Sequence, residues 1–308
     1  MSLCRIYTIV VTYNAMQWID RCLSSLRLSS VSVVPVIVDN GSQDNTVEYI
    51  RTHFPEAIVL EQKKNLGFGQ GNNKGIEYAL ANNATHVLLL NQDASIRPDT
   101  IDKMLAHDDG MHLLSPVHLN GSEDHIDRLF YQHTLIESAA TNGLIEDLLL
   151  NGKANTCYDV EYVNAACWLL PISMVRRIGG FNPLFTHYGE DDNYIQRIHF
   201  HRMGVRLVTN AFIAHDRNAH GNEKIYQRGV FYRKRLLIET NIGLSHKERF
   251  LLRHKSALQE FGHAIKTHNL YAFICDCVQA GIKICTNSHA IRISRQTESS
   301  IAANWLQV

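Results

Sequence analysis

The first hundred residues alternate between two hydrophobic periods, and this alternation restricts the fold more than any other feature. Short β-branched runs at 6–11 and 33–38 are each followed by apolar residues at helical spacing. Two further runs, 57–60 and 86–90, enclose a helical pattern over 75–80. Strands that are apolar on both faces and alternate with helices form parallel sheets covered on both sides. We therefore predict an α/β fold with a mainly parallel sheet between helices.

Charge divides the chain into two regions. The 308 residues suffice for one large domain with an appendage. Thirty basic and thirty acidic side chains cancel, which argues against nucleic acid as a partner. Residues 1–220 carry 17 Lys and Arg against 24 Asp and Glu, whereas residues 221–308 carry 13 against 6. We predict a catalytic domain over 1–220 and a basic helical region over 221–308.

The seven cysteines show no Cys-x-x-Cys pair and no regular spacing. This pattern argues against a disulfide framework or structural zinc and favours a reducing, cytoplasmic compartment. The N-terminus lacks a secretory signal pattern, and no apolar run reaches the roughly 20 residues that a membrane span needs. We therefore expect a cytoplasmic protein.

Polar residues cluster directly after each predicted strand. Ligands of open α/β sheets bind beyond the carboxyl ends of the strands. The four segments concerned are Thr12-Tyr-Asn14, Asp39-Asn-Gly-Ser42, Asn65–Asn72 and Asn91-Gln-Asp93. We expect the ligand site where these segments meet.

The third of these segments is rich in glycine. Gly67, Gly69 and Gly71 begin like a dinucleotide fingerprint, but the sixth position is Asn72 and the segment follows the third strand. We expect a loop whose backbone N–H groups approach a phosphate or sugar at a helix N-terminus. The alternative is a glycine-rich turn without a ligand.

Several acidic side chains and one histidine can carry chemistry. Asp93 follows a buried strand and can hold a divalent metal, or it can simply cap the next helix. Glu190-Asp191-Asp192 can supply a general base, or form a solvated acidic first turn. His215 ends a short strand and can ligate the same metal as Asp93, or be structural.

In this order the segments resemble the family 2 inverting nucleotide-sugar glycosyltransferases of the Rossmann-like GT-A fold, above all the rhamnosyltransferase and galactofuranosyltransferase-like members. The resemblance covers about residues 5–220. The stretches that carry it are Val10–Asn14, Val38–Asp44, Asn65–Asn73, Leu89–Asp93 and Gly189–Asp192.

The resemblance implies a role for each segment. Asn91–Asp93 corresponds to the D-x-D motif that binds Mn²⁺ or Mg²⁺, and His215, 24 residues after Asp191, completes the metal shell. Asp191 corresponds to the catalytic base, with Glu190 and Asp192 beside it. The implied donor-binding residues are Thr12, Tyr13, Asn14, Asp39, Asn40, Asn65, Gly67, Phe68, Gly69, Asn72, Asn91 and Gln92.

Two departures from the family pattern leave alternatives open. Asn91 replaces the first acid of the metal motif, and an amide oxygen ligates a cation without charge. A nucleotide-sugar-binding protein without catalysis is therefore one alternative. Two aspartates, Asp191 and Asp192, stand where the family pattern has one. We favour Asp191 as the base because it directly follows Glu190. A nucleotidyltransferase is the third reading, although Thr12-Tyr-Asn-Ala15 lacks the basic glycine-rich loop that it would need.

We therefore predict a metal-dependent, inverting glycosyltransferase of polysaccharide biosynthesis. It would move a sugar, with rhamnose as first choice, from a dTDP- or UDP-sugar to a cell-surface glycan or its lipid-linked precursor. The segments 163–168 and 179–183 resemble the frame of the family's acceptor cleft. Within them, Trp168 either stacks on a sugar or lies in the core.

The basic region has its own alternatives. Seven Lys and Arg lie within 233–255 beside apolar residues, and a second helical pattern follows over 270–278. These helices either pack on the sheet or on a second copy in a homodimer. Otherwise they dock peripherally on an anionic bilayer at the inner face of the membrane.

Overall fold

The β-branched runs of the sequence form one half of a mixed sheet. The computed structural model describes residues 4–137, 143–186, 188–217, 229–266 and 270–307. Strands β1 (Ile6–Thr12), β2 (Val33–Asp39), β3 (Ile58–Glu61) and β4 (His86–Leu90) pair in parallel in the order β3-β2-β1-β4. All four therefore end at the same edge of the sheet, as predicted.

The other half of the sheet mixes strand directions. β8 (Cys167–Pro171) pairs antiparallel with β4 and β6 (His112–Asn120), and β6 runs parallel to β9 (Gly204–His215). β5 (Ala94–Ile96) and β7 (Cys157–Asp159) pair antiparallel with β9. β9 continues through residues 209–211, which form a bulge opposite β6 rather than a turn.

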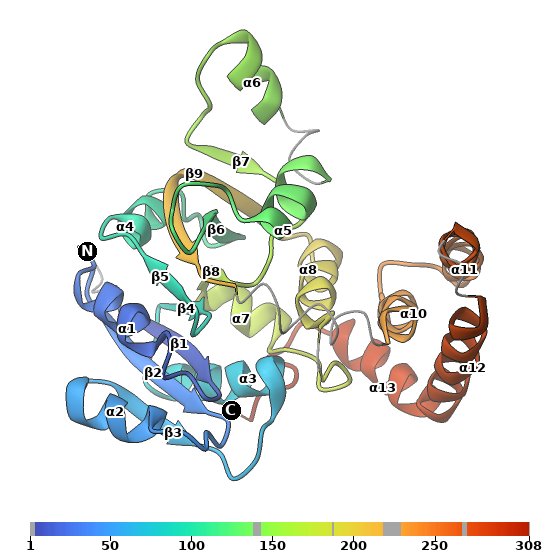
Figure 1. Ribbon diagram of the computed structural model, residues 1–308, viewed down its shortest axis with the longest axis horizontal. Coiled ribbons are helices and arrows are strands. Elements are labelled where there is room, and N and C mark those ends of the chain that lie inside the picture. The colour runs from blue at the N-terminus through green and yellow to red at the C-terminus, as the bar shows by residue number, and fades with distance from the viewer. Residues whose placement is uncertain (1–3, 138–142, 187, 218–228, 267–269, 308) are drawn as a thin grey trace.

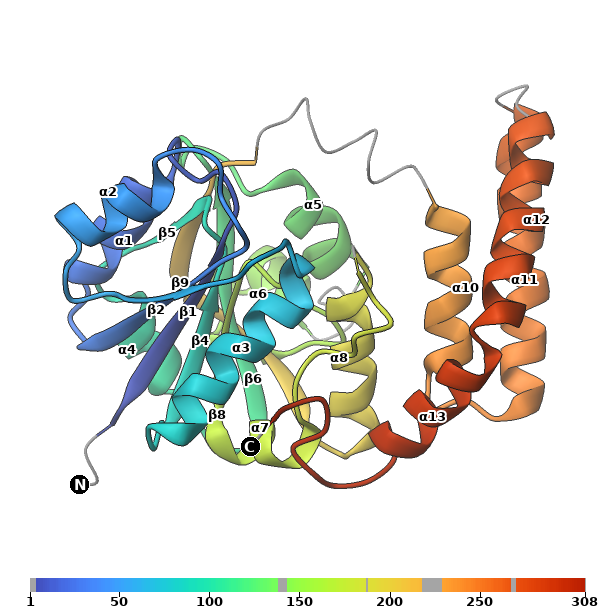
Figure 2. The same cartoon turned by 90° about the horizontal axis from the view of Figure 1, so that it is seen from below.

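Helices cover both faces of the sheet (Figures 1 and 2), and each face carries its own apolar cluster. Ile9 belongs to one cluster and the next residue, Val10, to the other, as the alternation along a strand requires. The helices on the Val10 side are α1 (Ile19–Arg27), α2 (Thr46–His53) and α4 (Thr100–Leu105). Those on the Ile9 side are α3 (Gly67–Ala81), α7 (Ile172–Ile178) and α8 (Glu190–Phe200).

The glycine-rich segment is a helix rather than the predicted loop, since α3 begins at Gly67. A Cβ atom on Gly75 would lie 2.4 Å from Ile9 Cγ2, and one on Gly71 would lie 2.8 Å from Val11 Cγ1. The glycines thus let α3 approach β1 closely. Tertiary packing outweighs the low helix propensity of glycine here.

Between β6 and β8 the chain forms several short elements. These are α5 (Arg128–Phe130), a π-helix η1 (Tyr131–Ile136), α6 (Leu144–Leu150) and β7. Residues 138–142 lie outside the described ranges.

The C-terminal region is helical, as predicted. It contains α10 (Val230–Thr240), α11 (His246–Lys266), α12 (Leu270–Thr286) and α13 (Ser288–Glu298). Helices α11 and α12 form the layer farthest from the sheet, with α10 between them and α8 (Figure 2). No helix in the described ranges is long and apolar enough to cross a membrane. The predicted domain boundary at 220/221 falls outside the described residues.

The last described residues return to the part of the chain that carries the sheet. Glu298 Oε1 accepts a 2.7 Å hydrogen bond from Asn182 Nδ2 and lies 3.5 Å from Arg197 Nε, with both charged side chains fully buried. Downstream, the Gly180 N–H donates to the Asn304 carbonyl (2.8 Å), and Leu306 packs against the main apolar cluster. We call residues 298–307 the C-terminal strap.

Candidate active site

Asp39 organises the turn that follows β2. Its Oδ1 accepts a hydrogen bond from Thr12 Oγ1 (3.0 Å), and its Oδ2 accepts from the backbone N–H groups of Gly41 (3.0 Å) and Ser42 (2.9 Å). The carboxylate is buried. The structure thus brings Thr12 and Asp39 together at the carboxyl edge of the sheet. Contact of Asp39 with a nucleoside stays a prediction.

The turns after β1 and β4 are joined by side-chain contacts. Gln92 Oε1 accepts a hydrogen bond from the Tyr13 N–H (2.8 Å). Asn14 adopts a left-handed conformation (φ 51°), and its Oδ1 accepts from the Gln43 N–H (2.8 Å). The Tyr13 side chain is exposed and open to a ligand.

Three asparagines shape the N-terminus of α3. Asn40 Nδ2 donates to the Gly67 carbonyl (3.2 Å), and Asn65 Oδ1 accepts from the Gly67 N–H (2.8 Å). The buried Asn72 instead donates to the Phe68 carbonyl one turn earlier (3.0 Å). Asn40 therefore ties the β2 turn to the start of α3, whereas the Asn72 amide is used within the helix.

Asn91, Asp93 and His215 converge at the ends of β4 and β9. His215 Nε2 lies 3.3 Å from Asp93 Oδ1 and 3.5 Å from Asn91 Nδ2. Burial raises the pKa of the Asp93 carboxyl, but interactions with His215 and Arg217 outweigh it and leave that pKa below its ordinary value. The predicted metal-binding residues are therefore neighbours.

The donor atoms of this cluster fit a hard cation that shares its shell with a bound ligand. Asn91 Oδ1 is buried and has no hydrogen-bond partner in the described part of the chain. Carboxylate oxygen, amide oxygen and imidazole nitrogen are all accepted by divalent ions. Among the described residues, no three His, Cys, Asp or Glu side chains group closely enough to hold a metal by themselves. A cation held by Asn91, Asp93 and His215 would therefore need further oxygen atoms from a bound ligand.

The three predicted acids form the first turn of α8, which begins at Glu190. Burial and then the charge of Asp191 raise the pKa of Glu190 to about 8. The same two causes raise the pKa of Asp192 to about 7. Glu190 and Asp192 therefore keep their protons to higher pH than ordinary carboxylic acids do.

Asp191 is held at both of its oxygens. Oδ1 accepts from the Asp192 N–H (3.0 Å), and Oδ2 accepts from the hydroxyl of Tyr162 (2.9 Å). Tyr162 lies between β7 and β8 in a segment without a recognisable motif. The sequence analysis missed it because only the folded chain brings it to α8.

The start of α3 and the start of α8 lie side by side. A Cβ atom on Gly69 would lie 3.0 Å from Phe181 Cβ and 3.6 Å from Glu190 Cβ. The Phe68 and Phe181 rings meet edge to face, 5.7 Å apart. The acid cluster therefore borders the predicted donor-binding segments.

Trp168 belongs to the core. Its side chain is fully buried and stacks on Phe181, with ring centroids 6.2 Å apart and ring planes at 13°. The core reading of this residue is therefore the one that the structure supports, and a sugar cannot stack on it.

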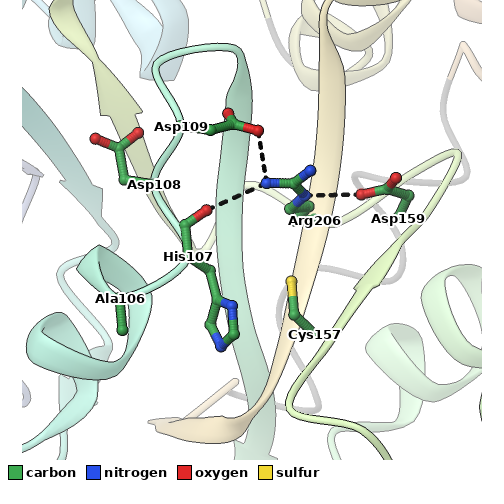
Figure 3. A pocket seen from close by; sticks show the side chains of 7 residues that line it. All are labelled: Ala106, His107, Asp108, Asp109, Cys157, Asp159 and Arg206. Carbon is green, nitrogen blue, oxygen red and sulfur yellow. Dashed lines mark hydrogen bonds and ion pairs between the residues drawn. The ribbon is translucent and has the colours of Figure 1, made fainter.

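A separate hollow lies at the other end of β9, away from His215 (Figure 3). Arg206 points into it and pairs with Asp109 (2.7 Å) and Asp159 (2.8 Å). The lining residues are Ala106, His107, Asp108, Asp109, Cys157, Asp159 and Arg206. None of the predicted site residues lines this hollow. Its Arg206, Asp109 and Asp159 already form ion pairs with one another.

Comparison with known proteins adds independent information. Residues 7–147 match the sequence model described as Glycosyl transferase family 2. The low-salt glycan biosynthesis hexosyltransferase Agl10 of Haloferax volcanii is 25% identical over 240 residues, which cover 76% of this chain and 75% of that protein. N-acetylglucosaminyl-diphospho-decaprenol L-rhamnosyltransferase of Mycobacterium tuberculosis is 31% identical over 106 residues, 32% of this chain and 34% of that protein.

Solved structures show the same fold. S. aureus TarS 1-349 in complex with UDP superposes with a TM-score of 0.56 at 16% identity, covering 84% of this chain and 72% of that one. Its complex with UDP-GlcNAc superposes with a TM-score of 0.58 at 15% identity, covering 96% and 89%.

Proposed function

The chain carries a family 2 glycosyltransferase domain of the GT-A fold, and from this premise we propose that it transfers one sugar, with inversion, from a nucleoside diphosphate to a hydroxyl group. The supporting observation is a continuous series of contacts along one edge of the sheet. Gln92 contacts Tyr13, Asn40 contacts Gly67, and Gly69 borders Glu190. One bound donor can therefore reach from the β2 turn to the acid cluster.

Asp191 is the proposed general base. The raised pKa values of Glu190 and Asp192 leave these neighbours wholly or partly protonated at neutral pH. Asp191 takes the proton of the acceptor hydroxyl as that oxygen attacks the anomeric carbon and the bond to the diphosphate breaks. A single displacement with one base inverts the anomeric centre. Glycoside hydrolysis needs a second carboxylic acid that protonates the leaving oxygen. A diphosphate leaving group does not require this protonation.

Asp93, His215 and the Asn91 amide oxygen are the proposed ligands of Mn²⁺ or Mg²⁺. A divalent cation bound there would stabilise the charge on the leaving diphosphate as a Lewis acid. Asp93 and His215 already lie 3.3 Å apart, so little rearrangement is needed to present both. The neutral Asn91 lowers the charge of the set, so we expect the donor diphosphate to contribute strongly to metal affinity.

The proposed donor is a dTDP- or UDP-sugar, with rhamnose as the first sugar to test. The proposed acceptor is a cell-surface glycan or its lipid-linked precursor. Support comes from the relatives, one of which is an L-rhamnosyltransferase acting on a diphospho-decaprenol and another a hexosyltransferase of glycan biosynthesis. A thermal-shift screen of nucleotide sugars with and without Mn²⁺ tests the donor, because a ligand that binds only the folded state raises its melting temperature.

The base assignment has a direct test. Asp191→Asn keeps the size of the side chain and removes its basicity, so we expect transfer to fall by roughly a hundredfold or more with donor binding near wild type. Asp192→Asn is the matched control and should retain most activity. Full activity in Asp191→Asn, with loss in the control, would move the role to Asp192.

A further proposed partner is an anionic bilayer at the cytoplasmic face of the membrane. The two outermost helices, α11 and α12 (Figure 2), carry exposed apolar side chains. We call them the α11–α12 surface: Leu251, Leu258, Ile265, Tyr271, Ile274, Val278 and Ile282. The exposed Lys247, Lys255 and Lys266 lie on the same α11 helix. Basic residues near an anionic surface each add about 1 kcal/mol, and apolar side chains insert shallowly.

Vesicle co-sedimentation tests this partner with the full chain. We expect binding to phosphatidylglycerol vesicles that weakens at high salt, and little binding to phosphatidylcholine. Leu258→Ser combined with Ile282→Ser should abolish it, whereas Leu28→Ser, at an equally exposed leucine after α1, should not. A stable dimer that the double variant disrupts, without vesicle binding, would instead identify the surface as a dimer interface.

A further inference from the structure

The bond between Tyr162 and Asp191 joins two distant parts of the chain. The Tyr162 hydroxyl donates to Asp191 Oδ2 at 2.9 Å. Asp191 lies in the first turn of α8, whereas Tyr162 lies between β7 and β8. No local turn or helix geometry requires this contact, so it is a product of the tertiary fold.

The segment that carries Tyr162 is anchored on both sides. The Val160 N–H donates to the Val205 carbonyl of β9 (2.9 Å), and Val163 is completely buried. The Tyr162 side chain itself is partly buried and packs against the main apolar cluster. The hydroxyl is therefore presented to α8 from a fixed support.

The other Asp191 oxygen is also held, because Oδ1 accepts from the Asp192 N–H (3.0 Å). With one donor at each oxygen, the plane and direction of the carboxylate are defined. Each oxygen retains a second lone pair, which is the position where an acceptor proton can arrive.

We propose that Tyr162 is a positioning residue that aligns the Asp191 carboxylate and favours its ionised form. This inference rests on the proposed function, in which Asp191 is the base. The acceptor proton moves to a free lone pair of Asp191, and the Tyr162 hydroxyl keeps its own proton throughout. Tyr162 thus acts on the reaction only through Asp191.

A merely structural role for the bond would have a different signature. A hydrogen bond to the ionised form lowers the pKa of a carboxyl group, so its removal raises that pKa. The acidic limb of the kcat/KM profile, which reports the base of the free enzyme, would then move to higher pH. A structural bond would change stability and leave the position of this limb unchanged.

The experiment measures the pH profiles of wild type and Tyr162→Phe, using a donor and acceptor on which the wild type is active. We expect kcat to fall about 10- to 100-fold because the carboxylate loses its alignment. From the usual strength of hydrogen bonds to charged groups, we expect the acidic limb to move up by about one to two pH units. The donor KM should change little, since the Tyr162 hydroxyl bonds to the proposed base. Tyr49→Phe is the matched control, because Tyr49 likewise donates to an aspartate, Asp20 (2.8 Å), on the surface of α1.

A second comparison uses the base variant. Phe keeps the ring against the apolar cluster, and thermal unfolding checks that the fold persists. In an Asp191→Asn background the Tyr162→Phe change should have little further effect, because residues that act as a unit are not additive.

Two results would overturn the inference. An acidic limb that stays in place in Tyr162→Phe would reduce Tyr162 to a structural role, and so would independent, multiplicative losses in the double variant. A wild type that transfers no sugar from any nucleotide donor would overturn the proposed function itself, together with this inference. The first two results leave the proposed function intact.

Discussion

Replacing Glu190 by glutamine should remove a pH dependence of stability. Glu190 is 6% exposed, and its Oε2 has no hydrogen-bond partner in the described structure. Burial, followed by the charge of Asp191, raises its pKa from 4.5 to about 8. Between these values the folded protein retains a proton that the unfolded chain has lost. The free energy of unfolding therefore falls as pH rises through this window.

The size of the effect follows from the shift. Each pH unit within the window costs about 1.4 kcal/mol, so the contribution of Glu190 falls by about 4 kcal/mol between pH 5 and pH 8. Glu190→Gln resembles the protonated form at every pH and lacks this loss. The variant and wild type should be similarly stable near pH 5, and the variant should be more stable by about 4 kcal/mol at pH 8.

Urea unfolding at half-unit steps from pH 5 to pH 8.5 measures this difference. Other titrating groups are common to both proteins, so their contributions largely cancel in the comparison. Asp191→Asn is an informative partner variant, because removing its charge should lower the pKa of Glu190 and reduce the slope in part. If the free energy of unfolding changes with pH in the same way for wild type and Glu190→Gln from pH 5 to pH 8.5, the raised pKa of Glu190 is wrong.

Three further predictions concern the metal, the nucleoside and the C-terminal strap. Asp93→Ala and His215→Ala should each weaken Mn²⁺-dependent donor binding in calorimetry, and undiminished turnover in excess chelator would remove the metal from the mechanism. Asp39→Ala should raise the donor KM and also weaken binding of the free nucleoside diphosphate. A loss of affinity confined to the intact sugar donor would contradict the proposed placement of the nucleoside. Glu298→Ala removes the ion-pair partner of the buried Arg197, which keeps its hydrogen bonds to the Ile178 and Gly180 carbonyls. It should lower the free energy of unfolding by about 3–5 kcal/mol, and wild-type stability in urea unfolding at neutral pH would contradict this.

The parts of the fold that the sequence predicted are those governed by local pattern. β-branched runs such as 33–38 form the parallel strands, and the polar residues that follow them meet at one edge of the sheet. Residues 7–147 match the family 2 model, and the predicted fold is confirmed. Among the site residues, Asp93 and His215 were predicted to share a metal, and the structure brings them to 3.3 Å.

The failures share a physical cause, which is that long-range packing decides them. Gly71 indicates a loop by propensity, yet it is helical because β1 lies against it. Trp168 was equally compatible with a sugar platform or with the core until the position of Phe181 was known. The contact of Tyr162 with Asp191 spans 29 residues and has no period or motif that could reveal it.

The C-terminal strap also bears on how the enzyme is made. During synthesis the N-terminal strands leave the ribosome first and can begin to fold, since domains fold as they emerge. Arg197, on the same helix α8 as Asp191, acquires its buried ion-pair partner only when Glu298 has emerged. A nascent chain that has made every predicted site residue, up to His215, therefore still lacks the partner of a buried arginine on the helix of the proposed base. Ribosome stalling or premature termination before residue 298 should release chains that contain all of these residues yet are prone to degradation.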